Sequence, residues 1–307
     1  MAAAVAQPLP GTGFERHQTV DAEGRPVTFY VTPAGSEARP LVLYIQGSGC
    51  TPMFRRDGER LRAGYASALA PLANPRLRVV TVEKPGIRPE SVGPTDGTAE
   101  GCSTEFRRDH TLDRWLASLH AALAAARQLP GSRSEATLVI GHSEGGTVAA
   151  RLARRDGQVS HVAVLSAGGQ GAEFDMIERA RRSATPGGEE AAMAEAEARW
   201  RAIRERPGSD EMVWGHPFRR WSSFGQAIPA EDLLATRASV FLVHGTRDES
   251  VPIASFDLTT LVLARRDRVE TLRLEGADHA LNHPGQAPPE GLRAVFSRVL
   301  GWYSSAQ

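Results

Sequence analysis

Lysine, cysteine and long apolar runs are all scarce in this sequence of 307 residues. Lysine occurs only once, as Lys84, so arginine supplies nearly all of the positive charge. Basic and acidic residues are equal in number, 36 of each, and this balance gives no indication of a nucleic-acid or anionic-membrane partner. No stretch approaches the roughly 20 consecutive apolar residues that a membrane-spanning helix needs, so we expect no membrane span.

Two cysteines are present, Cys50 and Cys102. Two thiols cannot form a disulfide scaffold, and their spacing matches no structural zinc site. They are therefore either buried free thiols or one bridge. Hydrophobic residues make up 41% of the chain and charged residues 23%, which is ordinary for a globular protein. The length allows one large α/β domain with an insertion, or two ordinary domains.

The N-terminus has neither the basic nor the apolar segment of a signal peptide. Residues 4–6 read Ala-Val-Ala, which resembles the small-residue end of a cleavage site, and an ordinary frayed terminus fits equally well. We expect residues 1–12 to form a flexible N-terminus.

Short apolar runs recur through most of the chain, and each of them ends in a polar or glycine-rich loop. Runs that are rich in β-branched residues and lack polar alternation are typical of parallel strands covered on both faces. Such runs occur at residues 41–45, 78–82, 137–140, 162–165, 240–243 and 269–274. Two earlier stretches, near 13–21 and 26–32, alternate more and predict an antiparallel hairpin at the sheet's edge.

Helical patterns lie between most of these runs. They cover residues 57–70, 110–129, 144–155, 251–265 and 287–302. The alternation of strands and helices predicts right-handed βαβ units and a mostly parallel, doubly wound α/β sheet.

Two segments are too long to be ordinary connections, residues 86–109 and 170–236. The second combines a charged, alanine-rich helical stretch with a cluster of aromatic residues. We expect it to be a helical cap inserted into a core formed by residues 13–169 and 237–307.

The strongest chemical signal is at residues 141–145, which read Gly-His-Ser-Glu-Gly and fit the pattern G-x-S-x-G. The motif follows an apolar strand and opens a helix, which is the context that a nucleophilic serine requires. A sharp turn of this kind needs small neighbours and presents Ser143 at the positive end of the helix. A glycine-rich turn without chemistry is the alternative interpretation.

A serine is a weak nucleophile unless a base removes its proton, so a histidine and an acid must follow in the chain. Asp248 and His279 each lie just beyond an apolar strand, at the edge where active sites of open α/β sheets form. Asp257 and Asp278 are alternative acids, and His142 and His244 are expected to be structural. His283 with His279 and Asp278 could suggest a metal site, but no third ligand cluster is apparent, and we expect no metal or other cofactor.

Four segments resemble the active-site motifs of the α/β-hydrolase superfamily, and the similarity extends from about residue 13 to 303. Residues 141–145 resemble its nucleophile elbow, 244–252 its acid-bearing loop, and 276–279 its histidine loop. Residues 44–49, Tyr-Ile-Gln-Gly-Ser-Gly, resemble its oxyanion-hole strand and turn. The sequence departs from the pattern at Gln46, where many relatives carry histidine.

The resemblance implies an oxyanion hole made of two backbone N–H groups, each contributing roughly 3–4 kcal/mol to lowering the barrier. One belongs to Glu144 and the other to Gly47 or Ser48. The Glu144 carboxylate is then either a structural acceptor or an anchor for a cationic substrate group. Lys84, after the neighbouring strand, either reaches the site or supports the turn.

The superfamily's fold also places the loops that carry Cys50 and Cys102 side by side. A bridge there would close a loop of roughly 50 residues and stabilise the protein by about 4 kcal/mol. We favour this disulfide over two free thiols, and with it an exported protein, periplasmic or secreted, over a cytoplasmic one.

These residues predict acyl transfer to water through Ser143, His279 and Asp248, with a small-molecule carboxylic ester as substrate. A peptide or amide hydrolase is the main enzymatic alternative, and a non-catalytic ligand-binding protein is the alternative of another class. The sequence does not determine the oligomeric state, or the acyl and alcohol groups of the substrate. The expected substrate pocket contains Gln46, Trp214, Phe218 and Trp221, the last three on one face if their segment is helical, although Pro217 makes a loop equally compatible.

Overall fold

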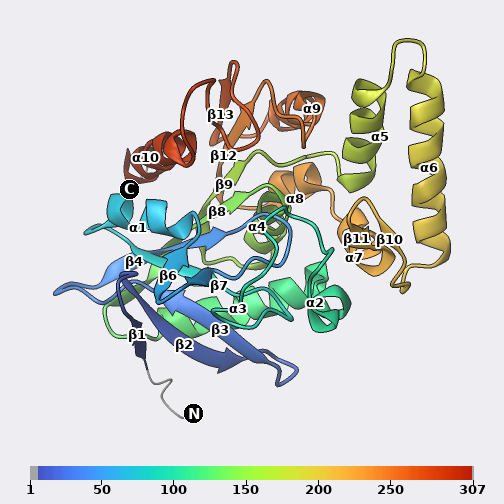
Figure 1. The fold of residues 1–307 in the computed structure, drawn as a ribbon. Helices are drawn as coiled ribbons and strands as arrows, with labels where there is room; N and C mark the ends of the chain where they lie inside the picture. Colours follow the sequence, from blue (N-terminus) through green and yellow to red (C-terminus); the bar gives the residue numbers. More distant parts are fainter. Residues whose placement is uncertain (1–5, 306–307) are drawn as a thin grey trace.

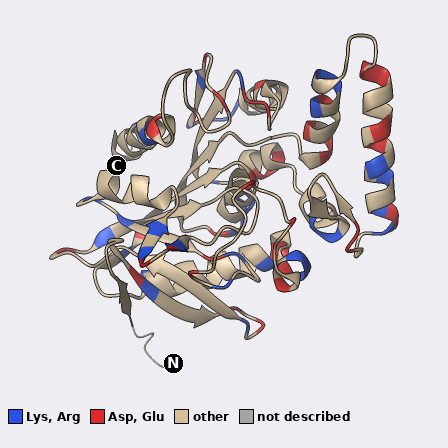
Figure 2. Ribbon diagram, in the orientation of Figure 1, with Lys and Arg blue, Asp and Glu red and all other residues tan. Residues whose placement is uncertain are grey.

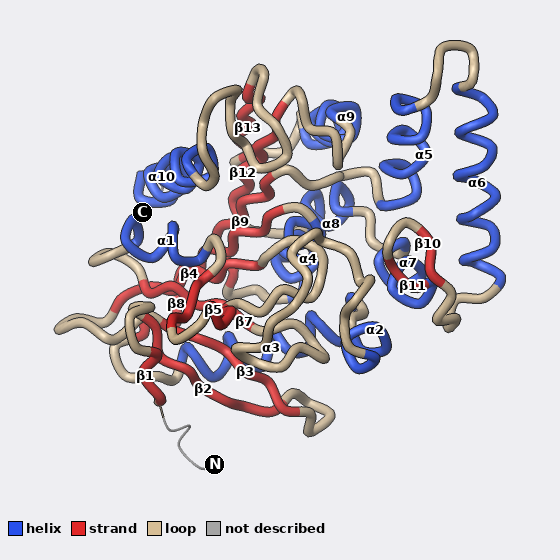
Figure 3. The backbone as a smooth tube through the Cα atoms, viewed as in Figure 1, coloured by secondary structure: helices blue, strands red, loops and turns tan. Residues whose placement is uncertain are grey.

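The structure is a computed structural model that describes residues 6–305. Its centre is a sheet of nine strands that runs through the middle of the molecule (Figures 1 and 3). In their spatial order the strands are β1 (Gln7–Leu9), β2 (Phe14–Val20), β3 (Pro26–Val31), β7 (Arg78–Val82), β4 (Arg39–Ile45), β8 (Ser132–His142), β9 (Val159–Leu165), β12 (Ser239–Gly245) and β13 (Val269–Leu274).

Neighbouring strands from β7 to β13 are parallel, and β1, β2 and β3 add antiparallel pairs at one edge. The expected edge hairpin is therefore present as β2 and β3. The expectation that residues 1–12 are flexible is wrong for Gln7–Leu9, because this segment pairs with Phe14–Arg16 of β2. Ala4 and Val5 of the segment that resembles a cleavage site lie outside the described residues.

Helices cover both faces of the sheet (Figure 1). The apolar faces of one group pack with the sheet into one core cluster: α3 (Leu112–Arg127), α4 (Glu144–Arg155), α8 (Pro229–Ala235) and α9 (Ile253–Leu263). A second core cluster lies on the other face, beneath α1 (Ala66–Ala73) and α10 (Glu290–Ser305). The predicted doubly wound α/β architecture is confirmed. Within residues 6–305, no helix is both long and apolar enough to cross a bilayer.

The helix expected at residues 57–70 is wrong for its first half. Phe54–Asp57 and Arg60–Ala63 form the hairpin β5–β6, and α1 begins only at Ala66. Gly58 has a φ of 60° in the two-residue turn between these strands. Glycine adopts this conformation without a steric penalty, so the chain reverses there instead of continuing as a helix.

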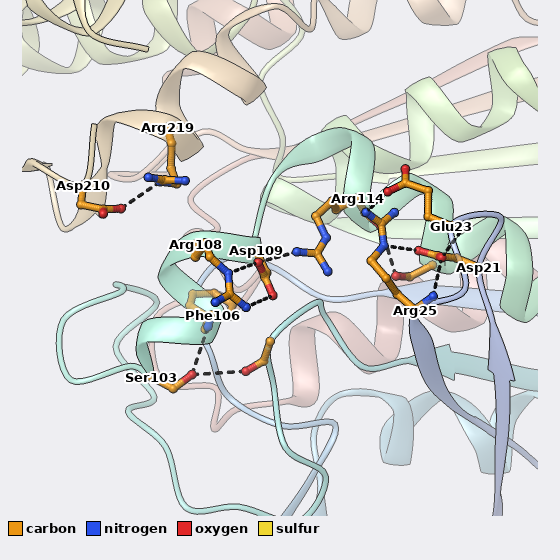
Figure 4. Close-up of polar contacts among 12 residues, drawn as sticks. Asp21, Glu23, Arg25, Ser103, Phe106, Arg108, Asp109, Arg114, Asp210 and Arg219 are labelled. Carbon is orange, nitrogen blue, oxygen red and sulfur yellow. Dashed lines mark hydrogen bonds and ion pairs between the residues drawn. The ribbon is translucent and has the colours of Figure 1, made fainter. Parts of the chain in front are cut away.

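The long loop after β7 contains one short helix, α2 (Thr104–Asp109). Ser103 caps it by accepting a hydrogen bond from the backbone N–H of Phe106 at 3.0 Å (Figure 4). Asp109 at its other end pairs with Arg108 and Arg114 (Figure 4). These contacts fix the segment that follows Cys102.

Residues 172–225, between β9 and β12, form a separate group of elements at one side of the sheet (Figure 1). Its helices α5 (Ala172–Ser183) and α6 (Glu189–Glu205) lie side by side and carry many charged residues (Figure 2). The hairpin of β10 (Met212–Val213) and β11 (His216–Pro217) follows, and then α7 (Phe218–Gly225). This group of elements has an apolar cluster of its own, formed by Trp200, Ile203, Phe218 and Trp221. By contrast, α8 packs on α4 and belongs to the main core.

Candidate active site

Ser143 lies in a sharp turn between β8 and α4. Its φ of 56° and ψ of −128° are rare for a residue with a side chain. The turn needs glycine on both sides, because a Cβ at Gly141 would lie 2.1 Å from the Gly145 carbonyl oxygen. A Cβ at Gly145 would lie 2.3 Å from the carbonyl oxygen of Ile45. The strand, the turn and the helix are arranged as the sequence motif predicts.

The structure brings Ser143, His279 and Asp248 together from three loops. The Nε2 atom of His279 is 3.0 Å from the Oγ atom of Ser143. Its Nδ1 atom is 2.8 Å from Oδ2 of Asp248. Both distances lie within hydrogen-bond reach, so the imidazole can take a proton from the serine while the carboxylate holds the opposite ring nitrogen.

Asp248 is held as an acceptor by its own loop. Its Oδ1 atom accepts hydrogen bonds of 2.8 Å from the backbone N–H groups of Ser250 and Val251. Burial by itself would raise the pKa of Asp248, but the hydrogen bond from His279 and electrostatic attraction to His279 and His244 lower that pKa below its ordinary value. The group therefore stays a carboxylate at neutral pH.

The alternative acids and the alternative ligand lie elsewhere. Asp257 is partly exposed and pairs with Arg273. Asp278 accepts a hydrogen bond of 2.9 Å from the backbone N–H of Asn282. His283 is exposed, and among residues 6–305 no three His, Cys, Asp or Glu side chains are grouped as metal ligands would be.

His142 lies directly behind the proposed base. Its ring centroid is 5.2 Å from that of His279, and its Nε2 atom donates a hydrogen bond of 3.0 Å to the His279 backbone carbonyl. Burial lowers the pKa of His142 to about 4, so the ring is neutral. His244 similarly supports the acid loop, because its Nε2 atom donates to the Val251 carbonyl at 3.1 Å. Both histidines help to position the loops of the site.

The glycine-rich turn after β4 lies against Ser143. A Cβ at Gly47 would be 3.1 Å from the Ser143 Cβ and 3.6 Å from its Oγ, so the Gly47 backbone passes beside the hydroxyl. Ser48 follows in the same turn, and Glu144 comes directly after Ser143. The backbone segments expected to supply the oxyanion hole are therefore adjacent.

Lys84 supports this turn from beneath. Its ammonium group donates hydrogen bonds to the Gly49 carbonyl at 2.7 Å and to the Gly47 carbonyl at 2.5 Å. The side chain is fully buried and lies over the Trp115 ring. Burial lowers the pKa of Lys84 to about 8, although attraction to Glu144 opposes the shift. The only lysine of the sequence thus fixes the turn on both sides of Ser48.

The Glu144 carboxylate is fully engaged inside the protein. Its Oε1 atom is 2.9 Å from Nε2 of His110 and 3.6 Å from the Lys84 ammonium. Its Oε2 atom accepts hydrogen bonds from both Nε, at 2.9 Å, and Nη2 of Arg220. Burial would raise the pKa of Glu144, but Arg220, His110 and Lys84 lower it well below its ordinary value. These contacts favour the structural role of this carboxylate over that of an anchor for a substrate amine.

Sequence reasoning missed two members of this network, His110 and Arg220. His110 lies 34 positions from Glu144 in the sequence, and Arg220 lies 76 positions away. Neither stands in a motif, so no local signal could have identified them. The contact of Arg220 depends on how the 170–236 insertion packs on the core, and that of His110 depends on the path of the loop between α2 and α3.

A cavity of about 1150 Å³ opens over Ser143. Among the residues that line it are Gln46, Trp214 and Trp221, which are expected in the substrate pocket from the sequence, together with Phe224 and Met176. The expectation for Phe218 is wrong, because its side chain packs inward with Trp200 and Ile203. The shared helical face is also absent, because Trp214 lies in the β10–β11 turn with a φ of 47°, outside the helix α7 that carries Phe218 and Trp221.

Cys50 and Cys102 form a disulfide, with their Cα atoms 6.0 Å apart. It ties the end of the glycine-rich turn to the segment before α2, across a sequence separation of 52 residues. Removing this cross-link increases the entropy of the unfolded chain, so we expect the Cys50→Ala/Cys102→Ala double variant to lose about 2–4 kcal/mol of folding free energy. Denaturant unfolding measures this loss. Thiol titration of the denatured, unreduced protein should find no free thiol, and two titratable thiols would contradict the bridge.

The sequence profile described as "Alpha/beta hydrolase family" matches residues 43–295. The chain belongs to this family. The matched region contains the serine, acid and histidine loops described above, and membership in the α/β-hydrolase family supports hydrolase activity. No curated protein sequence matches the chain.

Solved α/β-hydrolase structures resemble the chain in fold. Est1E from Butyrivibrio proteoclasticus has a TM-score of 0.58 at 17% identity, over 95% of this chain and 99% of that one. The meta-cleavage product hydrolase CumD from Pseudomonas fluorescens IP01 has a TM-score of 0.54 at 19% identity, over 94% and 98%. A puromycin-hydrolyzing peptidase from Mycobacterium tuberculosis has a TM-score of 0.61 at 16% identity, over 97% of this chain and 41% of that one. At these identities the likeness establishes the shared fold alone.

Proposed function

We propose that this protein is a serine hydrolase that cleaves carboxylic esters through an acyl-enzyme intermediate. One observation carries the proposal: a single imidazole, His279, lies 3.0 Å from the Ser143 hydroxyl and 2.8 Å from the Asp248 carboxylate. Nucleophilic catalysis requires a serine hydroxyl beside a base whose ring is oriented by an acid, and Ser143, His279 and Asp248 have this arrangement. No cofactor takes part in the proposed chemistry.

In the proposed mechanism, His279 takes the hydroxyl proton as the Ser143 Oγ atom attacks the ester carbonyl carbon. The negative charge that forms on the carbonyl oxygen is stabilised by backbone N–H groups of Glu144 and of Gly47 or Ser48. His279 then protonates the departing alcohol, and the serine ester remains. Water, deprotonated by His279, attacks this ester and releases the acid.

Amide or peptide hydrolysis uses the same machinery and is the alternative enzymatic function. The sequence argument for it was a free Glu144 carboxylate that could bind a substrate amine. Because that carboxylate is paired with Arg220, His110 and Lys84, the argument loses its basis, and ester cleavage is the better-supported proposal. A non-catalytic binding role is not favoured by a serine and a base within hydrogen-bond distance.

Labelling by a fluorophosphonate tests the nucleophile directly. We expect the wild-type protein to lose esterase activity in step with covalent labelling, with mass spectrometry locating the label on Ser143. The Ser143→Ala variant is the control and should not react. Absence of labelling in a folded wild-type protein would contradict the proposed function.

We also propose that residues 170–236 act as a cap whose aromatic wall selects the substrate. Trp214 and Trp221 line the cavity over Ser143. Replacing Trp214 by alanine removes apolar contact area, so we expect KM to rise by about tenfold for longer acyl chains, with little change for acetate esters. The measurement is kcat/KM across nitrophenyl esters of increasing length.

Phe218→Ala is the matched control for this prediction, because Phe218 lies in the same segment but faces the internal cluster. It is expected to lower the melting temperature without changing the preference for chain length. If wild type and Trp214→Ala have the same dependence of kcat/KM on chain length, Trp214 does not select the substrate and only packs within the cap.

A further inference from the structure

Arg220 of α7 joins the insertion to the turn that carries Ser143. The side chain is buried, and its Nε atom donates a hydrogen bond of 2.9 Å to Oε2 of Glu144. Its Nη2 atom donates to the same oxygen. Glu144 follows Ser143 directly in the chain, and its backbone N–H is one of the proposed oxyanion donors. A buried ion pair therefore connects the insertion to a residue that is proposed to contact the reacting carbonyl oxygen.

The Glu144 carboxylate depends on Arg220 for one of its two oxygens. Its Oε1 atom is 2.9 Å from Nε2 of His110 and 3.6 Å from the Lys84 ammonium. Among residues 6–305, Oε2 has no hydrogen-bond partner other than Arg220. A buried carboxylate oxygen without a donor is costly, so loss of Arg220 would make this side chain move to find one. Because Glu144 is the first residue of α4, such a movement would also shift its backbone N–H.

The second proposed donor is linked to the same carboxylate through Lys84. The Lys84 ammonium donates hydrogen bonds to the carbonyl groups of Gly47 and Gly49. Since a peptide group is planar, holding the Gly47 carbonyl also sets the direction of the Ser48 N–H in the same peptide group. Both proposed donors therefore depend on one buried group of charges, of which Arg220 is the member contributed by the insertion.

Arg220 also contacts the wall of the cavity over Ser143. Its guanidinium carbon is 4.1 Å from the ring centroid of Trp221 and 4.6 Å from that of Phe224. Both rings line the cavity. Stacking on two aromatic rings holds the plane of the guanidinium, so its N–H donors keep a fixed direction toward Glu144.

Attachment of the insertion does not depend on this ion pair alone. The Oγ atom of Ser223, also on α7, accepts a hydrogen bond of 2.9 Å from the backbone N–H of Leu112 at the start of α3. Phe224 packs into the main core cluster. A buried ion pair contributes little net stability compared with apolar packing, so a cation at position 220 is not needed to hold α7 in place. The contacts of Arg220 with Glu144 indicate a role in the geometry of the turn instead.

We propose that Arg220 is a positioning residue of the hydrolase: it holds Glu144 so that the backbone N–H groups of the oxyanion hole point at the carbonyl oxygen in the transition state. The insertion then takes part in the chemical step as well as in substrate selection, because α7 supplies the arginine. This inference rests on the proposed ester hydrolysis and adds a residue on which its transition state depends.

A pair of esters that differ in one atom tests this role. Nitrophenyl acetate has a carbonyl oxygen, and nitrophenyl thionoacetate has sulfur at that position, which is a weaker hydrogen-bond acceptor. An aligned oxyanion hole favours the oxygen ester, and the oxygen preference is its kcat/KM divided by that of the thiono ester. In Arg220→Met we expect kcat for nitrophenyl acetate and the oxygen preference each to fall by about tenfold, with KM nearly unchanged. An oxygen preference equal to that of wild type overturns the proposal.

Ser223→Ala is the matched control, because it removes another hydrogen bond between α7 and the core without removing a partner of Glu144. It should lower the melting temperature and leave the oxygen preference at the wild-type value. An equal loss in Ser223→Ala and Arg220→Met would mean that any loosening of the insertion has this effect, which contradicts the specific role of Arg220. Melting curves check folding. If Arg220→Met does not fold, Arg220→Gln replaces it, with the same expected result and the same contradicting result.

Fluorophosphonate titration separates this inference from the proposed function. Its end point counts the reactive serines in each preparation, so kcat is expressed per active site. If wild type is not labelled at Ser143, the proposed hydrolase function fails. If wild type and Arg220→Met are labelled to the same extent and have the same oxygen preference, the hydrolase proposal stands and the positioning role of Arg220 is overturned.

Discussion

The Ser143→Ala and His279→Ala variants are expected to lose roughly 10⁴- to 10⁶-fold in kcat, with little change in substrate binding. Ser143 attacks poorly unless His279 accepts its proton, and His279 has no hydroxyl to deprotonate when Ser143 is absent. The Ser143→Ala/His279→Ala double variant should therefore be little slower than Ser143→Ala alone. Stopped-flow or long-time-course assays with a nitrophenyl ester measure these rates, and melting curves check that each variant is folded.

Asp248→Asn provides the sharpest part of this test. The amide keeps the shape of the side chain but offers the wrong partner to His279 Nδ1, so the imidazole loses its orienting acceptor. We expect a loss of roughly 10³- to 10⁴-fold in kcat. Asp257→Asn is the matched control, because Asp257 pairs on the surface with Arg273. Near-normal activity of Asp248→Asn would mean that another acid orients the base.

Replacing Lys84 by methionine is expected to have the second-largest effect. The change leaves the Gly47 and Gly49 carbonyl groups without their buried donor and removes one cation from Glu144. We expect about 2–4 kcal/mol of lost folding free energy. The turn beside Ser143 also loses its support, so kcat of the folded enzyme should fall by roughly tenfold to hundredfold as the oxyanion donors shift.

Arg78→Met is the control for the Lys84 prediction. Arg78 is also a buried cation near β7, and it donates to the carbonyl groups of Thr32 and Pro130 at 3.1 and 2.9 Å. It stands at the opposite end of that strand, away from Ser143. Both variants should be destabilised in urea, but only Lys84→Met should show a lower kcat per folded molecule. Equal kcat values in the two variants would reduce Lys84 to a purely structural residue.

Much of the fold could be predicted because it follows from local patterns. Unbroken apolar runs gave the positions of the parallel strands, and β13 was placed at its observed bounds. The hairpin β5–β6 was mistaken for a helix because its apolar spacing fits both structures over so few residues. Only the turn at Gly58 distinguishes them.

The proposed catalytic residues could be predicted for a related reason. Ser143, Asp248 and His279 each stand directly after an apolar strand, and parallel strands bring their carboxyl ends to one edge. Their order in the chain and the G-x-S-x-G spacing then limit the choices to a few residues. The preference for a Cys50–Cys102 bridge over two free thiols depended on the resemblance, because the superfamily's fold places the two loops side by side.

The environment of these residues was decided only by the tertiary structure. Neither the engagement of Glu144 by Arg220 and His110 nor the inward orientation of Phe218 is encoded in a local pattern. Local sequence determines backbone conformation, since that depends on neighbouring residues. The partners of a buried charge depend on which distant segments pack around it, and here these are the oxyanion turn, the loop before α3 and the insertion that carries α7.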